Sequence, residues 1–115
     1  MGLDRLPEPG LTGIPVIVAA ELWTGVRKAG ASHPRSAARL EAFLGLFTVV
    51  EFTLNAALHY AEIRTDAEAG GKPIGPLDLL IAAQARSLGA TLVTANIREF
   101  KRVRGLKVLD WSNPR

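Results

Sequence analysis

Four polar side chains of this sequence could together bind a divalent cation. Glu21 follows a short apolar run, and Asp78 opens an apolar helix. Asn96 follows a second apolar run, with Glu99 three residues later. Acidic groups gathered in one place repel one another unless a cation lies between them. Oxygen ligands without histidine or cysteine favour Mg²⁺ or Mn²⁺ over zinc, and such a site typically activates water for attack on a phosphodiester.

The local sequence around Asp78 places this carboxylate in the first turn of a helix. Gly75 is the expected N-cap and Pro76 the first helical residue, where the missing N–H of proline costs nothing. Asp78 then takes the third helical position, close to unpaired N–H groups. It should border a buried stripe made of Leu77, Leu80, Ile81 and Leu88. The simpler alternative is that this acid only stabilises its own helix through the helix dipole.

The elements that must position these residues alternate between strands and helices. The hydrophobic periodicity predicts strands over 14–18, 47–52, 90–94 and 107–109, and helices over 19–29, 33–46, 54–69 and 76–88. Strands separated by helices indicate an α/β fold with a parallel sheet and helices on both faces. Ligands of such folds bind at the carboxyl ends of the strands, which is where Glu21, Asn96 and Glu99 fall.

Length and composition exclude several classes of protein. The 115 residues suffice for one domain, taken here as 1–115, and 48% hydrophobic residues are ordinary for a globular protein. The chain has no cysteine, which excludes disulfides and zinc–thiolate sites and fits a reducing cytoplasm. No run approaches the roughly 18 apolar residues that a membrane span needs, so no membrane association is expected. The net charge of +3 is a mild bias towards polyanions.

A basic segment lies beside the proposed site. Its cations are Arg98, Lys101, Arg102, Arg104 and Lys107. An RNA backbone would use such a segment, although a solvated helix end often has the same composition. The two histidines, His33 and His59, lie far from the acids in sequence and are expected on helices without a catalytic role.

Three motifs in order resemble those of PIN-domain ribonucleases, most of all the VapC toxins of bacterial toxin–antitoxin pairs. They are Val18–Val26, Pro73–Asp78 and Leu92–Phe100, and the segment Val103–Trp111 is similar to the tail of that family. The resemblance covers roughly residues 4–111. Each motif alone is weak evidence, but their order along nearly the whole chain is strong evidence.

The resemblance implies a PIN-like three-layer fold and a Mg²⁺-dependent endoribonuclease toxin, with Mn²⁺ as a possible substitute. It assigns Glu21 to the second acidic position of the family and Asp78 to the third, both as metal ligands. Asn96 and Glu99 match the fourth position. The implied partners are an RNA substrate such as tRNA or ribosomal RNA, a cognate VapB-like antitoxin and a second copy of the chain, in the cytoplasm.

One departure from the family concerns the N-terminus. The family begins with an apolar strand that ends in Asp-Thr or Asp-Ser, whereas Asp4 is preceded by three residues only. The domain is therefore expected to be N-terminally shortened, with Leu3–Pro9 as the end of a helix. The strands at Val16 and Leu92 should then lack their shared neighbour, which weakens both fold and metal site. The alternative function is an inactive remnant that binds the antitoxin or dimerises.

Overall fold

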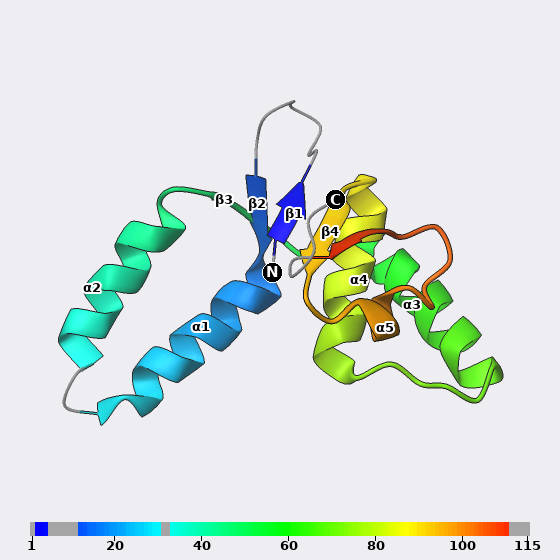
Figure 1. Cartoon of the computed structure of the whole chain (residues 1–115), viewed down its shortest axis with the longest axis horizontal. Coiled ribbons are helices and arrows are strands. Elements are labelled where there is room, and N and C mark those ends of the chain that lie inside the picture. The colour runs from blue at the N-terminus through cyan, green and yellow to red at the C-terminus, as the bar shows by residue number, and fades with distance from the viewer. Residues whose placement is uncertain (1, 5–11, 31–32, 111–115) are drawn as a thin grey trace.

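The computed structural model describes residues 2–4, 12–30 and 33–110 (Figure 1). In chain order, its elements are β1 (Gly2–Asp4), β2 (Thr12–Pro15), α1 (Val16–Lys28), α2 (His33–Leu44), β3 (Thr48–Val50), α3 (Leu54–Ala69), α4 (Pro76–Leu88), β4 (Thr91–Thr94), α5 (Ile97–Phe100) and β5 (Lys107–Asp110). The predicted α/β class is confirmed, because helices flank a five-stranded sheet.

The sheet is mixed, and its central strand is the short β1. The strand order is β3-β2-β1-β4-β5, with β2 parallel to β3 and β4 parallel to β5. β1 is antiparallel to both neighbours, so Leu3 lies opposite Gly13 on one side and Leu92 on the other. The prediction that β2 and β4 lack a shared neighbour was therefore wrong. Gly2–Asp4 is a strand rather than a helix end, and residues 5–9 lie outside the described part.

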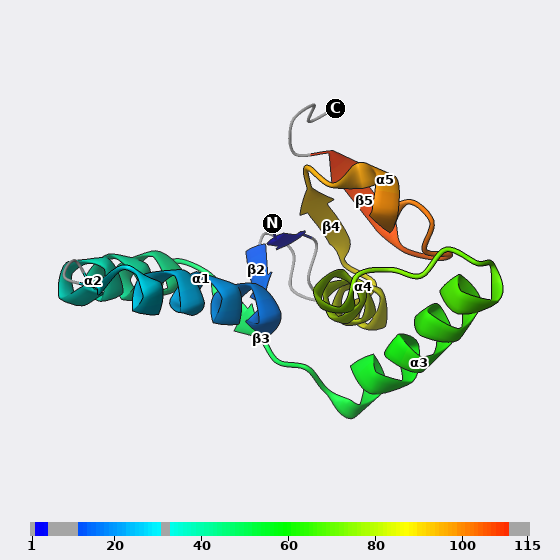
Figure 2. The same ribbon diagram turned by 90° about the horizontal axis from the view of Figure 1, so that it is seen from below.

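The helices divide into two groups. α1 and α2 lie side by side and form an arm that extends away from the sheet, as Figures 1 and 2 both show. α3 packs along α4 on the other side of the molecule, and α4 in turn packs against β4 and β2. The radius of gyration is 14.9 Å, whereas a compact domain of this length has about 13 Å. The arm accounts for the difference.

The first predicted strand and helix meet earlier than the sequence indicated. The strand was expected over 14–18, but β2 ends at Pro15, and Val16, Ile17 and Val18 form the first turn of α1. A short run of apolar β-branched residues fits a strand and a buried helix equally well by pattern. Consequently Glu21 lies in the second turn of α1 rather than in the first.

The core is built around α4. Its buried residues are Leu79, Ile81, Ala82, Ala83, Gln84 and Ala85. Small alanines allow α4 to approach α3 and the sheet closely, and Leu3, Leu92 and Phe100 complete the cluster. The Gln84 amide donates a 2.8 Å hydrogen bond from Nε2 to the Val50 carbonyl, which fixes α4 to the end of β3. In the described ranges, no helix is both long and apolar enough to cross a bilayer.

Candidate functional site

The helix that carries Asp78 begins where the sequence predicted. Gly75 is the N-cap with extended backbone angles, Pro76 is the first helical residue, and Asp78 is the third. At the other end, Gly89 closes the helix with a φ of 63°, a conformation that costs glycine little. The predicted buried stripe is partly wrong. Leu77 is 44% exposed, because the buried face of α4 is centred on Ile81 and Ala82 instead.

The structure brings Asp78 together with Asn96 and Glu99. Asn96 is the N-cap of α5 and Glu99 lies in its first turn, so both follow the carboxyl end of β4. The Asn96 amide donates a 3.1 Å hydrogen bond from Nδ2 to Asp78 Oδ2. The Glu99 carboxyl group lies close enough to Asp78 to raise the pKa of that residue. Two acids and an amide from two sequence segments thus meet at the same edge of the sheet.

The surroundings of Asp78 in this cluster raise the pKa of its carboxyl group. Burial raises the pKa of this carboxyl from 3.8 to about 6, with a further contribution from the neighbouring Glu99 carboxyl. The hydrogen bond from Asn96 favours the ionised form and opposes this rise. Asp78 can therefore keep its proton in mildly acidic solution, and a cation beside this carboxyl would take the place of that proton.

Three supporting contacts were not anticipated from the sequence. The Thr94 hydroxyl, which is buried, accepts a 3.0 Å hydrogen bond from the Asn96 N–H. The Gly75 N–H and the Arg102 guanidinium each lie 3.5 Å from Glu99 Oε2. A threonine two residues before an asparagine is a known turn pattern, so the first contact had a sequence signal. The contact of Glu99 with Gly75 had none, because it joins segments that are distant in sequence. Arg102, by contrast, lies three residues after Glu99, a spacing that favours an ion pair on a helix.

Glu21 is not part of this cluster. Its side chain is exposed on α1, and it makes no hydrogen bond or ion pair with the other three predicted residues in the described part of the chain. Likewise, among the side chains that the structure describes in residues 13–30 and 34–110, no group of three His, Asp or Glu is placed to hold a metal ion. The role assigned to Glu21 stays a prediction.

The donor set of Asp78 and Glu99 fits a hard divalent cation. Both ligand groups are carboxylates, and Mg²⁺ is commonly bound by one or two carboxylates together with water and substrate phosphate. Burial and the neighbouring Glu99 disfavour the ionised form of Asp78, and a bound cation would offset both effects. The predicted preference for oxygen-liganded metals is therefore compatible with the geometry.

The basic residues predicted to bind RNA differ in their positions. Arg98 lies on α5, and Lys101 follows it; both are exposed. Arg102 contacts Glu99, as described, and donates a 2.9 Å hydrogen bond to the Lys72 carbonyl. Arg104 lies in the loop before β5.

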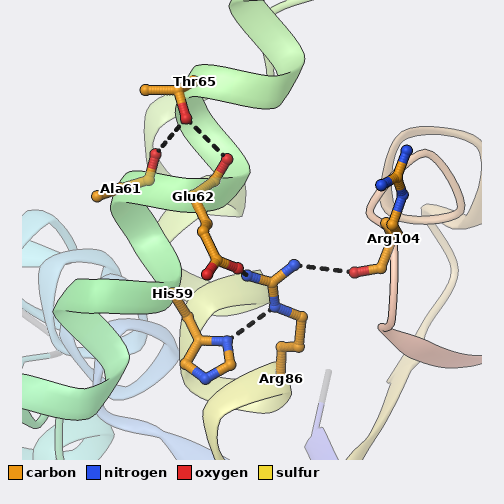
Figure 3. Close-up of polar contacts among 6 residues, drawn as sticks. All are labelled: His59, Ala61, Glu62, Thr65, Arg86 and Arg104. Atoms are coloured by element: carbon orange, nitrogen blue, oxygen red, sulfur yellow. Dashed lines mark hydrogen bonds and ion pairs between the residues drawn. The ribbon is translucent and has the colours of Figure 1, made fainter.

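His59, expected on a helix face, accepts a hydrogen bond at Nδ1 from the Arg86 Nε–H group (Figure 3). This contact gives the histidine a structural role in joining α3 to α4. His33 begins α2, as expected.

Comparison with known sequences identifies a domain family over most of the chain. The pattern of the PIN domain matches residues 3–106. Ribonuclease VapC2 of Rickettsia felis is 38% identical over 109 residues, which span 95% of this chain and 81% of that protein. The tRNA(fMet)-specific endonuclease VapC of Shigella flexneri is 39% identical over 99 residues, which span 86% of this chain and 74% of that protein.

Solved structures give the same result. The structure of VapBC-1 from nontypeable Haemophilus influenzae superposes with a TM-score of 0.86 at 32% identity, over 95% of this chain and 80% of that one. VapBC2 from Rickettsia felis, bound to a DNA fragment from its promoter, superposes with a TM-score of 0.81 at 40% identity, over 86% of this chain and 74% of that one.

Proposed function

We propose, from the premise that this chain belongs to the PIN-domain family of VapC ribonucleases, that it hydrolyses RNA phosphodiesters with Mg²⁺ at the Asp78–Glu99 site. The resemblance seen in the sequence motifs is thereby confirmed at the level of the family. The observation that carries the proposal is the Asp78–Asn96–Glu99 cluster at the carboxyl end of β4, where burial and, to a lesser extent, Glu99 raise the pKa of Asp78 to about 6. We take residues 1–115 as one PIN domain.

Each residue of the cluster has a separate task in this proposal. Asp78 and Glu99 hold the cation, and the first turn of α4 fixes the backbone of Asp78. Asn96 orients Asp78 through Oδ2, and Thr94 in turn fixes the turn that carries Asn96. A bound divalent ion supplies charge neutralisation at the phosphate and activation of the attacking water. Glu21 remains a proposed additional ligand from α1.

The substrate and partner are proposed from the relatives. One relative is named a tRNA(fMet)-specific endonuclease, and the structural neighbours are VapBC complexes. We therefore propose a tRNA as the substrate, a VapB-like antitoxin as the partner, and the cytoplasm as the site of action. A homodimer stays part of the proposal. Mn²⁺ should replace Mg²⁺, because both ions accept oxygen ligands.

Cleavage of total tRNA is the first test. The purified chain should produce discrete fragments with Mg²⁺ and none with EDTA. Asp78→Asn keeps the shape of the side chain and should lower the cleavage rate at least about a hundredfold, because it removes one of two charged ligands. Asp66→Asn, a charge-matched change on α3, should cleave at least as fast as the wild type. Fragments that persist in EDTA or with Asp78→Asn would contradict the proposal.

A second candidate function is an inactive module that binds the antitoxin. The observation that favours it is the lack of a third acidic or histidine ligand near Asp78 and Glu99 in the described part of the chain. A cooperatively folded chain that binds a VapB-like antitoxin but leaves tRNA intact with Mg²⁺ and with Mn²⁺ would decide for this alternative.

A further inference from the structure

A cleft of about 390 Å³ lies beside the acidic cluster and has no role so far. It lies between α3, α4, the connection of these helices and the loop that follows α5. Its volume is in the range of small-molecule sites, which is about 300–1,000 Å³. Four cations from three of these segments line it, namely Lys72, Arg86, Arg102 and Arg104.

Two of the four cations are already engaged. Arg86 donates to His59, to Glu62 and to the Arg104 carbonyl, so each of its three guanidinium nitrogens is engaged (Figure 3). Arg102 contacts Glu99 and the Lys72 carbonyl. Lys72 Nζ and the Arg104 guanidinium, by contrast, make no hydrogen bond or ion pair within the described ranges. Figure 3 shows the Arg104 side chain extending away from Arg86.

The charge left in the cleft is positive. Glu62 balances Arg86 and Glu99 balances Arg102, which leaves Lys72 and Arg104 against the single lining acid, Asp66. The wall between these polar groups is apolar and includes the buried residues Ile63 and Val103. A cationic rim above an apolar wall suits a ligand that combines a phosphate with a flat, weakly polar ring.

Arg102 connects the cleft to the acidic cluster. Its guanidinium contacts Glu99 and also lines the cleft, so the two sites share this side chain. An RNA strand with its scissile phosphate at Asp78 and Glu99 would pass over Arg102 to reach Lys72 and Arg104. The cleft therefore has the position of a neighbouring nucleotide of the same strand.

We infer that this cleft binds one nucleotide of the RNA substrate beside the scissile bond. Its phosphate lies between Lys72 and Arg104, and its base lies against the apolar wall. This inference rests on the proposed function, because it names a second contact of the same substrate. Among the basic residues predicted from the sequence to bind RNA, the inference assigns Arg104 to this nucleotide. Arg98 and Lys101 do not line the cleft.

Binding of total tRNA in EDTA tests the inference without cleavage. The double variant Lys72→Gln/Arg104→Gln should weaken binding about tenfold and lower the slope of log K against log salt by roughly 0.7, the value for one phosphate of a single strand. The control is Arg27→Gln/Lys28→Gln at the end of α1, which makes the same charge change far along the arm and should alter binding less than twofold.

Two single variants separate cleft binding from general attraction. Asp66→Asn removes the opposing charge and should tighten tRNA binding about two- to threefold, because the phosphate loses a repulsive neighbour. Ala67→Leu, in the half-buried wall, narrows the cleft at constant charge. It should weaken binding several-fold while the salt slope stays unchanged. Melting curves check that each variant is folded.

The outcomes distinguish this inference from the proposed function. Mg²⁺-dependent cleavage with unchanged tRNA binding in the double variant would overturn the inference and leave the function standing. Weaker binding of the antitoxin with unchanged tRNA binding would identify a protein surface instead and would also overturn it. A wild-type chain that neither cleaves nor binds tRNA would contradict both the inference and the proposed function.

Discussion

The ionised form of Asp78 lowers the stability of the folded chain, because this carboxyl is partly buried and a second acid lies beside it. Its pKa is about 6 in the folded state and 3.8 otherwise, so the folded chain binds this proton more tightly. The stabilisation that the protonated Asp78 carboxyl contributes is therefore complete below about pH 4 and is lost as the pH rises through about 6. For a fully shielded group this shift corresponds to about 3 kcal/mol, and the partial exposure of Asp78 reduces our expectation to about 1 kcal/mol.

Asp78→Asn should therefore stabilise the metal-free protein at neutral pH. The difference in melting temperature between variant and wild type should be near zero at pH 4, grow up to pH 6 and then level off at roughly 4 °C. Thermal melts in EDTA from pH 4 to pH 8 provide the measurement. Glu99→Gln as a background should flatten the pH dependence, because the second acid is then neutral. A difference that does not vary with pH would contradict the assigned cause.

At the scale of elements, the Arg86 side chain joins three segments of the fold, namely α4, α3 and the loop before β5. From α4 it reaches His59 and Glu62 on α3 and the Arg104 carbonyl in the loop before β5 (Figure 3). Its side chain is 11% exposed, so groups left without a donor would be poorly hydrated. The same residue closes one end of the cleft described above.

Arg86→Met should consequently destabilise the fold by about 2–3 kcal/mol, since His59 and the Arg104 carbonyl both lose their donor. Chemical denaturation at neutral pH measures this loss. The matched control is Arg64→Met on α3, where the exposed pair with Glu68 contributes less than about 0.5 kcal/mol. Equal effects of the two substitutions would show that the Arg86 contacts carry little energy.

The sequence predicts those elements best whose ends have local signals. Gly75-Pro76 and Gly89 delimit α4, and Leu54–Ala69 is a helix as expected, with the Thr53 hydroxyl as its N-cap. β1 could not be predicted, because three residues carry no periodicity. Its pairing depends on the gap between β2 and β4.

The candidate site likewise has some features that the local sequence predicts and others that it does not. The position of Asp78 in its helix follows from neighbouring residues, whereas its contact with Glu99 depends on how α4 and α5 pack at the sheet. The contacts of Arg102 with the Lys72 carbonyl and of Arg86 with His59 likewise join residues that are distant in the chain. Periodicity and capping signals contain no information on such pairs, so these contacts required the structure.

The whole molecule consists of a packed body and a projecting arm. α3, α4 and the sheet enclose the core cluster, whereas α2 contacts mainly α1, and α1 in turn contacts α4, β2 and β3. The arm also carries large exposed apolar side chains, among them Leu22 and Phe43. Local stability follows buried apolar contacts, so the two parts should differ in stability.

Native-state hydrogen exchange should show this difference. Amides of α4 should exchange only through global unfolding, whereas amides of α2 and the outer half of α1 should exchange at least about a hundredfold faster through local opening. The exchange of individual amides, followed by NMR at neutral pH, provides the measurement. Equal protection in α2 and α4 would show that the arm unfolds only together with the body.

The two neighbouring acids, Asp78 and Glu99, also influence how a gene for this toxin changes over generations. Under the proposed function, a mutation of Asp78 to asparagine would remove the activity and would also spare the folded chain the cost of burying an ionised carboxyl. Natural selection against the activity would then meet no opposing selection for folding. Inactive copies should therefore persist as well-folded proteins.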